Sequence, residues 1–588
     1  MGRKLLKLFH SSLYMIQCHK NIVLNLLLSI CLFILVSIPR LFSLDAHWSS
    51  DETLWINRSA EFADAVDQGK FSETLIAYHP GVMTMWFAGL RVFYTKLPLD
   101  IPVREQWFLH LIRARQFIGI FVWACIGIAC LLVYQLFGRW VALASLVCLA
   151  YSPLFLAQTR RVHTDALATV FILFTVLLLL QYCESRQSLR YLLFSGIAFG
   201  LAVLSKSYTL ILLPWVPLCL FLFPSSLQKS RDRFFSRITE ILCFLNCTLL
   251  TVLGVWPIFW TPFFGILALC LSGLTFVLYS LMKNAHYPPA LIAIACAGLV
   301  LVGVRATQTV WLTLDRVGWA VTTPHEVEHF FLGKVVHDPG WLFYPFVLTI
   351  KSTPLMLPLV FLGCFFLWKH RKHSTETNRQ LKLVLALVSV VILFTVCLSL
   401  TSKKFSRYLL PVFPILEILA AVGFVEVIRW GFERFRIETT VVKRTIAGCA
   451  CLCFFFIQIL PVLMLHPYYG TYYNFCWKVT DITKIITVGD ASGLDIAANY
   501  LNQKPNARRM QVQVSPLATE FVRYYFHGNA YRADRHISQT PDYEVVYIRD
   551  SQIGRVPQTG TLNGELEHQI SLNGIDHVWI YRVKPQEN

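Results

Sequence analysis

The chain alternates long apolar stretches with short charged segments, and this pattern predicts a membrane protein built from many helices. Stretches of about 17 to 25 apolar residues are long enough to cross a bilayer as a helix. About thirteen are present, at 21–40, 114–136, 141–158, 164–182, 190–205, 208–223, 238–256, 262–282, 288–304, 342–367, 382–400, 408–428 and 444–465. The sequence therefore predicts a mainly α-helical polytopic membrane domain over residues 1–465.

The pattern changes after residue 465. The stretch SGLDIAANYLN has the spacing of an amphipathic helix, whereas RRMQVQVSP, YEVVYIRD and HVWIYRV have the alternation and composition of strands. Residues 466–588 are therefore expected to form a small α/β domain outside the bilayer.

Composition supports a membrane protein. Hydrophobic residues make up 56% of the chain and charged residues 15%, and the mean hydropathy is +0.55, which is too apolar for a soluble globular protein. No small-residue cleavage site follows the first apolar stretch, so we expect an uncleaved first helix. Nearly all of the 17 cysteines lie in apolar runs, which favours small buried hydrophobes over a disulfide framework.

The distribution of basic residues predicts the topology. The net charge is +18, but the basic residues gather in short loops, as in cytoplasmic loops of membrane proteins, so the charge does not require nucleic acid as a partner. The segments CESRQSLR, QKSRDRFFSR, WKHRKHSTETNRQLK and IRWGFERFRIETTVVKR fall on the side of the basic N-terminus. An odd number of spans then places the C-terminal domain outside, with the loops at about 41–113 and 305–341.

Two adjacent acids stand out in the first outer loop, which reads DAHWSSDETLWINRSAEF over 45–62. Asp51 and Glu52 are unexpected neighbours in a chain with 52 basic and 34 acidic residues. One interpretation is that the pair performs chemistry. The other is that it caps an interfacial helix from about Thr53 to Asp67, because acids favour the first turn of a helix.

A second set of charges lies on the outer side, where the topology does not predict cations. Its members are Arg160, Arg161, Lys206, Lys351, Lys403, Lys404 and Arg407. Single lysines such as Lys206 and Lys404 have an alternative explanation, because long side chains near helix ends reach the headgroups. Taken together, the cations predict a bound anion, since Lys and Arg both suit phosphate oxygens. At a membrane surface, that phosphate most naturally belongs to a lipid.

Lys351 and Asp165 lie in or beside apolar stretches. Lys351 follows Trp341 by about ten residues, roughly 15 Å along a straight helix, and an ionisable group at that depth indicates a functional site. Asp165 follows the Arg160–Arg161 pair closely, and its alternative role is to cap the next helix. His163 alone carries no functional weight, because an isolated histidine is more often structural.

Several of these segments occur together in a known group of enzymes. DETLWINRSAEF, YHPGVMTMWFAGL, RRVHTDALATV, YPFVLTIKSTP and KKFSRYLLPVFPIL resemble segments of the GT-C membrane glycosyltransferases, specifically the protein O-mannosyltransferase and lipid A aminoarabinose transferase superfamily. The resemblance covers the membrane region in order. It implies about a dozen helices, an outer C-terminal domain as in the bacterial branch, and sugar transfer from a polyprenyl-phosphate donor.

The resemblance also implies roles for individual residues. Asp51 and Glu52 match the acidic pair of the first outer loop, Asp165 matches the acid after the third span, and Arg407 in RYLLP matches a position near the donor phosphate. One segment departs from the pattern. Relatives carry a Trp-Gly-Glu-Gly-like stretch before the C-terminal helix, whereas this chain reads VGDASGLDIAANYLN over 488–502, so a catalytic role of the tail is not implied.

The chemistry explains why an acid and several cations are needed. An acceptor hydroxyl that displaces a polyprenyl phosphate in one inverting step needs a base, and cations must hold the charge on the departing phosphate. We expect Asp51 to be the base, while Glu52 orients it, binds acceptor or holds a metal. No plain DxD-type pair is present, so a divalent metal stays an open alternative. Arg58, about two turns beyond Asp51, and His79, before Pro80, are expected substrate contacts.

The sequence thus predicts a glycosyltransferase of the cell (plasma or inner) membrane, or of the endoplasmic reticulum in a eukaryote, acting on its outer face. The acceptor is a hydroxyl of a protein, a glycolipid or a polysaccharide. The donor phosphate is expected at Arg160, Arg161, Lys351, Lys403, Lys404 and Arg407. The alternative is a transporter or flippase of lipid-linked sugars. The enzyme is favoured because acids gather in one outer loop and inverted repeats are not evident.

Overall fold

The computed structural model describes most of the chain. The described residues are 37–77, 80–89, 103–185, 188–223, 230–260, 270–274, 277, 328–372, 374–477, 481–534 and 540–584. His79 and the predicted span 288–304 lie outside them, as do most of the predicted spans 21–40 and 262–282 and most of the loop 305–341.

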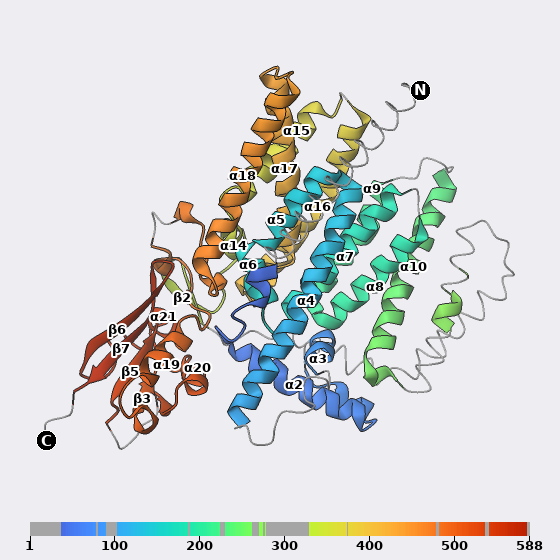
Figure 1. Ribbon diagram of the computed structural model, residues 1–588. Helices are drawn as coiled ribbons and strands as arrows, with labels where there is room; N and C mark the ends of the chain where they lie inside the picture. Colours follow the sequence, from blue (N-terminus) through green and yellow to red (C-terminus); the bar gives the residue numbers. More distant parts are fainter. Residues whose placement is uncertain are drawn as a thin grey trace, which may run out of the picture.

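A bundle of helices forms the larger part of the molecule (Figure 1). Its helices are α4 (Val103–Phe137), α5 (Arg139–Ala150), α6 (Pro153–Thr159), α7 (Thr164–Glu184), α8 (Leu189–Ser205), α9 (Trp215–Leu222), α10 (Ser230–Val255), α14 (Phe343–Lys351), α15 (Met356–His370), α16 (Thr375–Ser399), α17 (Val412–Arg434) and α18 (Thr440–Leu465). Helix α7 is apolar on all sides and buried almost throughout, as expected of a central helix. The predicted mainly α fold is confirmed.

The number of membrane spans differs from the prediction. Among the described residues, 5 helices are long and apolar enough to cross a membrane, or up to 7 if each bent pair counts as one span. These helices support a multi-pass membrane protein, while the predicted count of thirteen is not confirmed.

Two spans that the sequence predicts as single helices are broken. The predicted span 141–158 consists of α5 and α6, which meet at 62°, and the predicted span 342–367 consists of α14 and α15, which meet at 100°. Proline lies at each break, because Pro153 begins α6 and Pro354 separates α14 from α15. A proline lacks the N–H that would continue the helical hydrogen bonds, so the chain turns there.

The loop predicted to be the first outer loop contains a helix that lies across one end of the bundle (Figure 1). This helix, α2 (Ser50–Asp67), begins three residues before the predicted start at Thr53 and is followed by η1 (Phe71–Thr74) and α3 (Val82–Ala88). The loop ends earlier than predicted, because α4 begins at Val103 rather than 114. The added turns of α4 are held by Trp107, whose ring centroid lies 5.6 Å from that of Trp48 and 4.9 Å from that of Tyr524.

The C-terminal segment forms a mixed sheet with short helices. Its elements are α19 (Leu494–Asn502), β3 (Gln511–Val514), α20 (Thr519–Tyr525), β4 (Asn529–Arg532), β5 (Tyr543–Tyr547), α21 (Ile548–Gln552), β6 (Gly564–Leu572) and β7 (Ile575–Val583). The strand order is β4-β3-β5-β7-β6, with β4, β3 and β5 parallel and the remaining pairs antiparallel. The predicted helix and three strands are present. The polar strand β6 and the short strand β4 were not predicted, and β1 (His329–Phe331) and β2 (Lys334–Val336) form a separate hairpin.

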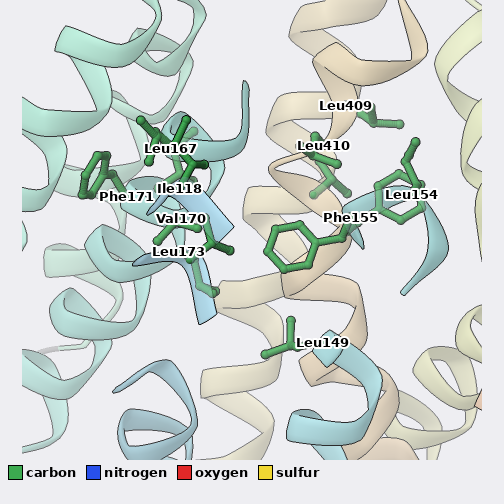
Figure 2. Close-up of a cluster of buried hydrophobic side chains, with 14 of the residues drawn as sticks. Ile118, Leu149, Leu154, Phe155, Leu167, Val170, Phe171, Leu173, Leu409 and Leu410 are labelled. Atoms are coloured by element: carbon green, nitrogen blue, oxygen red, sulfur yellow. The ribbon is translucent and has the colours of Figure 1, made fainter. Parts of the chain in front are cut away.

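An apolar core lies beside the ends of α6, α7 and α17. Figure 2 shows Phe155 of α6, Leu167 and Leu173 of α7, and Leu410 among its side chains. These residues are almost completely buried. Because Leu167 and Leu410 each lie within a few residues of a predicted site residue, packing of this core fixes the backbone that carries the site.

The two ends of α7 carry different kinds of charge. Asp165 lies at its first turn and Glu184 at its last residue, about 28 Å apart at 1.5 Å per residue, close to the thickness of a bilayer core. At the Glu184 end, Arg379 donates to Glu184 at 2.7 Å and to the Leu136 carbonyl oxygen at 2.9 Å. The basic loops before α8 and before α16 therefore share the end opposite Asp165.

Candidate active site

Asp51 lies in the first turn of α2 with its carboxylate partly open to solvent. The side chain is 38% exposed, and its Oδ2 lies 3.1 Å from Nη2 of Arg407 and 3.3 Å from Nε2 of His163. Partial burial opposes ionisation, but the charge of Arg407 and the hydrogen bond from His163 hold the pKa of Asp51 well below its usual range. Asp51 is therefore an ionised carboxylate whose partners are two cationic side chains.

Asp165 is the buried counterpart of Asp51. Its Oδ1 accepts a hydrogen bond from Lys206 at 2.7 Å and from the Tyr208 hydroxyl at 3.1 Å. Its Oδ2 lies 2.8 Å from Nδ1 of His163 and 3.7 Å from Nε of Arg407. Lys206 therefore does not reach for headgroups, as the alternative interpretation held, but neutralises a buried acid.

His163 joins the two acids, a role that the sequence did not indicate. Burial alone would lower its pKa, but Asp165 and Asp51 on either side of the ring raise it above the ordinary value. The protonated ring has two N–H donors, one for each carboxylate. Asp51, His163, Asp165, Lys206 and Arg407 form one set of charges, called here the active-site cluster.

Arg407 lies between the two carboxylates. It belongs to η5 (Ser406–Leu409), the turn before α17, and its guanidinium stacks 4.3 Å from the ring centroid of Phe405. Its side chain is 24% exposed. Arg407 is thus a predicted phosphate ligand that pairs with Asp51 and Asp165 and is still partly exposed to solvent.

Glu52 faces away from Asp51 and is completely buried. Nε and Nη2 of Arg115 donate to its two carboxylate oxygens at 2.7 and 2.5 Å. The backbone N–H groups of Val162 and Ser49 donate to the same carboxylate at 3.0 and 3.1 Å, and the Ser49 contact completes a capping box of α2. Asp51 and Glu52 therefore lie in different environments, and the capping interpretation holds for Glu52.

Arg160 and Arg161, both predicted phosphate ligands, have protein partners. Arg160 donates to the carbonyl oxygens of Pro39, Phe42 and Ser43 at 2.6 to 2.8 Å. Arg161 pairs with Asp490 at 2.5 Å and contacts His47.

Glu52, Arg115 and Arg160 form a second set of charges, called here the corner cluster. This cluster holds α2 and its preceding loop against α4 and α6.

The predicted lysines also have protein partners. Nζ of Lys351 donates to the carbonyl oxygens of Gly470 and Tyr472 at 3.0 and 2.8 Å. Lys351 is the last residue of α14, and the chain bends directly after it. Lys404 donates to Asp338 at 2.7 Å and to the Thr401 carbonyl. Lys403 is half-buried in the same loop.

Arg58, a predicted substrate contact, lies on α2 with its guanidinium 5.1 Å from the ring centroid of Trp55. Its distance from the active-site cluster along the helix is about two turns, as expected from the sequence. The other predicted contact, His79, lies outside the described residues.

A cavity of about 110 Å³ opens beside Arg407, between the helix bundle and the C-terminal domain. Lys351, Lys404 and Arg407 line it from the bundle, and Asp490, Arg549 and His577 are among the lining residues of the C-terminal domain. Asp490 belongs to the VGDASG stretch that departs from the pattern of similar enzymes. Arg161 holds the pKa of Asp490 well below its usual range. The sequence gives no signal that connects Asp490, Arg549 and His577 with the helix bundle, because each lies more than 300 positions from Arg161.

The described part of the chain contains no group of three or more His, Cys, Asp or Glu side chains that could hold a metal ion together. Asp51 and Glu52 do not form a joint site, because the Glu52 carboxylate is occupied by Arg115 and by two backbone N–H groups.

Comparison with known families adds an independent observation. Residues 112–256, which include Asp165 and Lys206, match the family model described as dolichyl-phosphate-mannose-protein mannosyltransferase. The resemblance to the GT-C membrane glycosyltransferases is confirmed. The match runs from within α4 to the end of α10 and includes the residues that supply the buried half of the active-site cluster.

Solved structures of GT-C glycosyltransferases are also similar to this chain. The archaeal oligosaccharyltransferase AglB from Archaeoglobus fulgidus, in complex with an inhibitory peptide and a dolichol-phosphate, is 11% identical, with 95% of this chain and 74% of that chain covered and a TM-score of 0.46. ArnT from Cupriavidus metallidurans bound to undecaprenyl phosphate is 14% identical, with 96% and 99% covered and a TM-score of 0.40. No curated protein matches the sequence.

Proposed function

We propose that this protein transfers a sugar from a polyprenyl-phosphate donor to an acceptor hydroxyl on the outer face of the membrane. The observation that carries the proposal is the ion pair between the partly exposed Asp51 and Arg407, set in a cluster of buried charges at one end of the bundle. The family match to residues 112–256 supports a lipid-phosphate donor. The acceptor belongs to a protein, a glycolipid or a polysaccharide.

Asp51 is the proposed base. An acceptor hydroxyl must lose a proton as it attacks the anomeric carbon, and a carboxylate within reach accepts it. In the ion pair with Arg407, Asp51 is a weak base because its pKa is low. A donor phosphate that draws the Arg407 guanidinium to itself would remove this restraint and raise the basicity of Asp51. Donor binding and base activation are thus coupled through one arginine.

Arg407 is the proposed ligand of the departing phosphate. Charge grows on the phosphate oxygens as the glycosidic bond breaks, and a guanidinium can hold two of them at once. Asp165 and Lys206 do not meet the substrate in this proposal. They position Arg407 and His163, because a buried carboxylate with fixed donors keeps its neighbours in place.

The reaction proposed is a single displacement with inversion at the anomeric carbon. A covalent glycosyl intermediate would require a second carboxylate on the other side of the sugar. The adjacent acid Glu52 is unsuited to this role, since its oxygens accept four hydrogen bonds from the protein. We assign Glu52 to positioning α2.

The outer location of the site is part of the proposal. The cluster lies at the end of α7 opposite Glu184, where Arg379 and the basic loops gather, and basic loops favour the cytoplasm. The free Cys476 is exposed on the C-terminal side of α18 and provides a probe. In a variant that keeps only this cysteine, a membrane-impermeant thiol reagent should label intact cells. Labelling only after the inner face is opened would contradict the topology.

A direct assay tests the activity. Purified protein in lipid vesicles is incubated with a panel of polyprenyl-phosphate sugars, and release of polyprenyl phosphate is followed by mass spectrometry. We expect one donor to be consumed when a suitable hydroxyl acceptor is present. Movement of intact donor between the two leaflets without cleavage would instead favour a flippase.

A further inference from the structure

Four cationic side chains are among the lining residues of the cavity beside Arg407, and three polar atoms of the lining lack a hydrogen-bond partner among the described residues. Lys351, Lys404, Arg407 and Arg549 face a single lining acid, Asp490. That acid is neutralised by Arg161 outside the cavity lining. The remaining positive charge favours an anion, because a cationic recess raises the local concentration of negative ligands.

The hydrogen bonds of the cavity cations show which of their N–H groups are available to a ligand. Lys351 donates to two carbonyl oxygens, and Lys404 pairs with Asp338. By contrast, Nε of Arg549 is buried without a hydrogen-bond partner among the described residues, as is Nε of Arg407. Buried N–H groups of this kind are rarely left unsatisfied in a working state of a protein.

Arg549 sits on a firmly attached segment. It belongs to α21, and the side chain of the neighbouring Gln552 donates to the carbonyl oxygens of Thr483 and Ile486 at 2.6 and 3.1 Å. The same side chain accepts from the Val488 backbone N–H at 2.8 Å. The base of Arg549 is thus tied to the stretch that carries Asp490, so the cavity wall is built as one unit.

Gly489 allows this wall to close. Its φ is +93°, and an added Cβ would lie 2.4 Å from the Tyr547 hydroxyl oxygen, too close for any other residue without displacement. The VGDASG stretch therefore packs directly on the end of β5, from which α21 continues. This packing brings Asp490 and Arg549 to the same cavity.

His577 supplies a complementary group. Its Nδ1 lies 2.8 Å from the Ile575 carbonyl oxygen, which can only accept, so Nδ1 carries the proton. Burial lowers the pKa of the ring, which keeps it neutral. Nε2 has no hydrogen-bond partner in the described part of the chain, and the ring lines the cavity. A neutral Nε2 accepts a hydrogen bond, as a sugar hydroxyl would offer.

We propose that the C-terminal domain completes the head-group site, with Arg549 as a second ligand of the substrate phosphate opposite Arg407 and His577 as an acceptor for a sugar hydroxyl. This inference rests on the proposed function and extends it to a domain for which the sequence implied no catalytic role. The cavity has a volume of about 110 Å³, about the volume that three to four water molecules occupy in liquid water. That space suits a phosphate and part of a sugar, while the lipid chain must lie elsewhere.

Binding measurements on the full-length protein test the proposal. The probes are a polyprenyl monophosphate, the corresponding polyprenol and inorganic phosphate, each titrated against the parent, Arg407→Gln, Arg549→Gln and Arg549→Lys. Removing one charge-assisted contact should weaken polyprenyl monophosphate binding about 10- to 100-fold in either Gln variant. Polyprenol binding should not change, and Arg549→Lys should retain part of the affinity.

The control is Arg508→Gln, which removes an exposed arginine from the same domain. It should bind the probe like the parent. Loss of affinity in Arg407→Gln with parental affinity in Arg549→Gln would overturn the inference and leave the proposed function intact. Parental affinity in both would overturn the proposed phosphate site itself. An effect of Arg549→Gln on inorganic phosphate alone, with none on the lipid phosphate, would also overturn the inference.

A second readout separates ligand binding from a structural role of Arg549. Thermal unfolding of each variant is measured with and without polyprenyl monophosphate. A ligand that binds only the folded protein raises its unfolding temperature. Arg549→Gln should unfold like the parent without the probe and gain less when it is added. An equal gain in both proteins would contradict the proposed contact.

Discussion

The active-site cluster and the corner cluster both pair carboxylates with arginines, yet their contacts serve different roles. In the corner cluster, Arg115 and Arg160 donate to a buried carboxylate and to backbone carbonyls that cannot leave. In the active-site cluster, Asp51 and Arg407 are 38% and 24% exposed and pair with each other. An incoming phosphate and hydroxyl can replace these contacts. The partner of a charged side chain therefore distinguishes a structural residue from a catalytic one better than its residue type does.

The largest effect is expected from Asp51→Asn. If Asp51 takes the acceptor proton, transfer should fall about 10²- to 10⁴-fold, the span typical of a positioned general base. The variant also loses the ion pairs with Arg407 and His163, but Asp51 is 38% exposed and is not the N-cap of α2, so the protein should stay folded. Sugar transfer under saturating donor and acceptor measures the loss, and Asp64→Asn on the exposed side of α2 is the control. A folded Asp51→Asn protein with near-parental transfer would remove the base assignment.

The opposite profile is expected one residue further on. Glu52→Gln leaves Arg115 buried without its counter-charge, and removal of one partner of a buried pair typically costs about 3–5 kcal/mol of unfolding free energy. Denaturant unfolding in bicelles measures this cost. The fraction that remains folded should transfer sugar close to the parental rate. A stable Glu52→Gln protein with a large rate loss would instead give Glu52 a direct chemical role and erase the contrast between the clusters.

The two predicted phosphate arginines provide a third test. Arg407→Gln should weaken polyprenyl monophosphate binding about 10- to 100-fold, since one charge-assisted contact is lost. Arg160→Gln should lower stability, because three carbonyl oxygens of the 39–43 segment lose their donor, while the folded protein keeps its affinity. Isothermal titration and thermal unfolding of both variants separate the effects. Equal losses of affinity would mean that both arginines meet the donor.

Sequence patterns predicted the elements better than their meeting points. The helix after Asp51, the helix in SGLDIAANYLN and three strands follow from local spacing and capping, which act over a few residues. The bends at Pro153 and Pro354 had a visible signal, yet the hydrophobic length of each stretch favoured one straight span. The length of an apolar stretch alone does not indicate whether its helix runs straight or bends.

The composition of the site was less predictable, for a physical reason. His163 looks like an isolated histidine in sequence, and it acquires a role only when α2 and η5 bring Asp51 and Arg407 to its two sides. Asp490 reaches Arg161 through the packing of a separate domain. Such contacts depend on tertiary structure, so residue type indicated a charged site while the pairing within it had to come from the fold.

The smallest effect is expected from His163, and it depends on pH. The folded pKa of His163 is raised above its ordinary value of about 6.5, so the protonated ring favours the folded state. Its contribution to stability should be fully present below pH 6.5 and disappear as the pH rises through the raised pKa. His163→Asn removes the ring charge and leaves a residue that is favourable at the N-cap position of α7. The stability difference between parent and variant should thus be largest near pH 5.5 and shrink in alkaline buffer. Thermal unfolding from pH 5.5 to 9 measures it, with the exposed His527→Asn as the control. A difference that stays constant or grows with pH would mean that His163 is neutral between Asp51 and Asp165, and the active-site cluster would then rest on Arg407 and Lys206 alone.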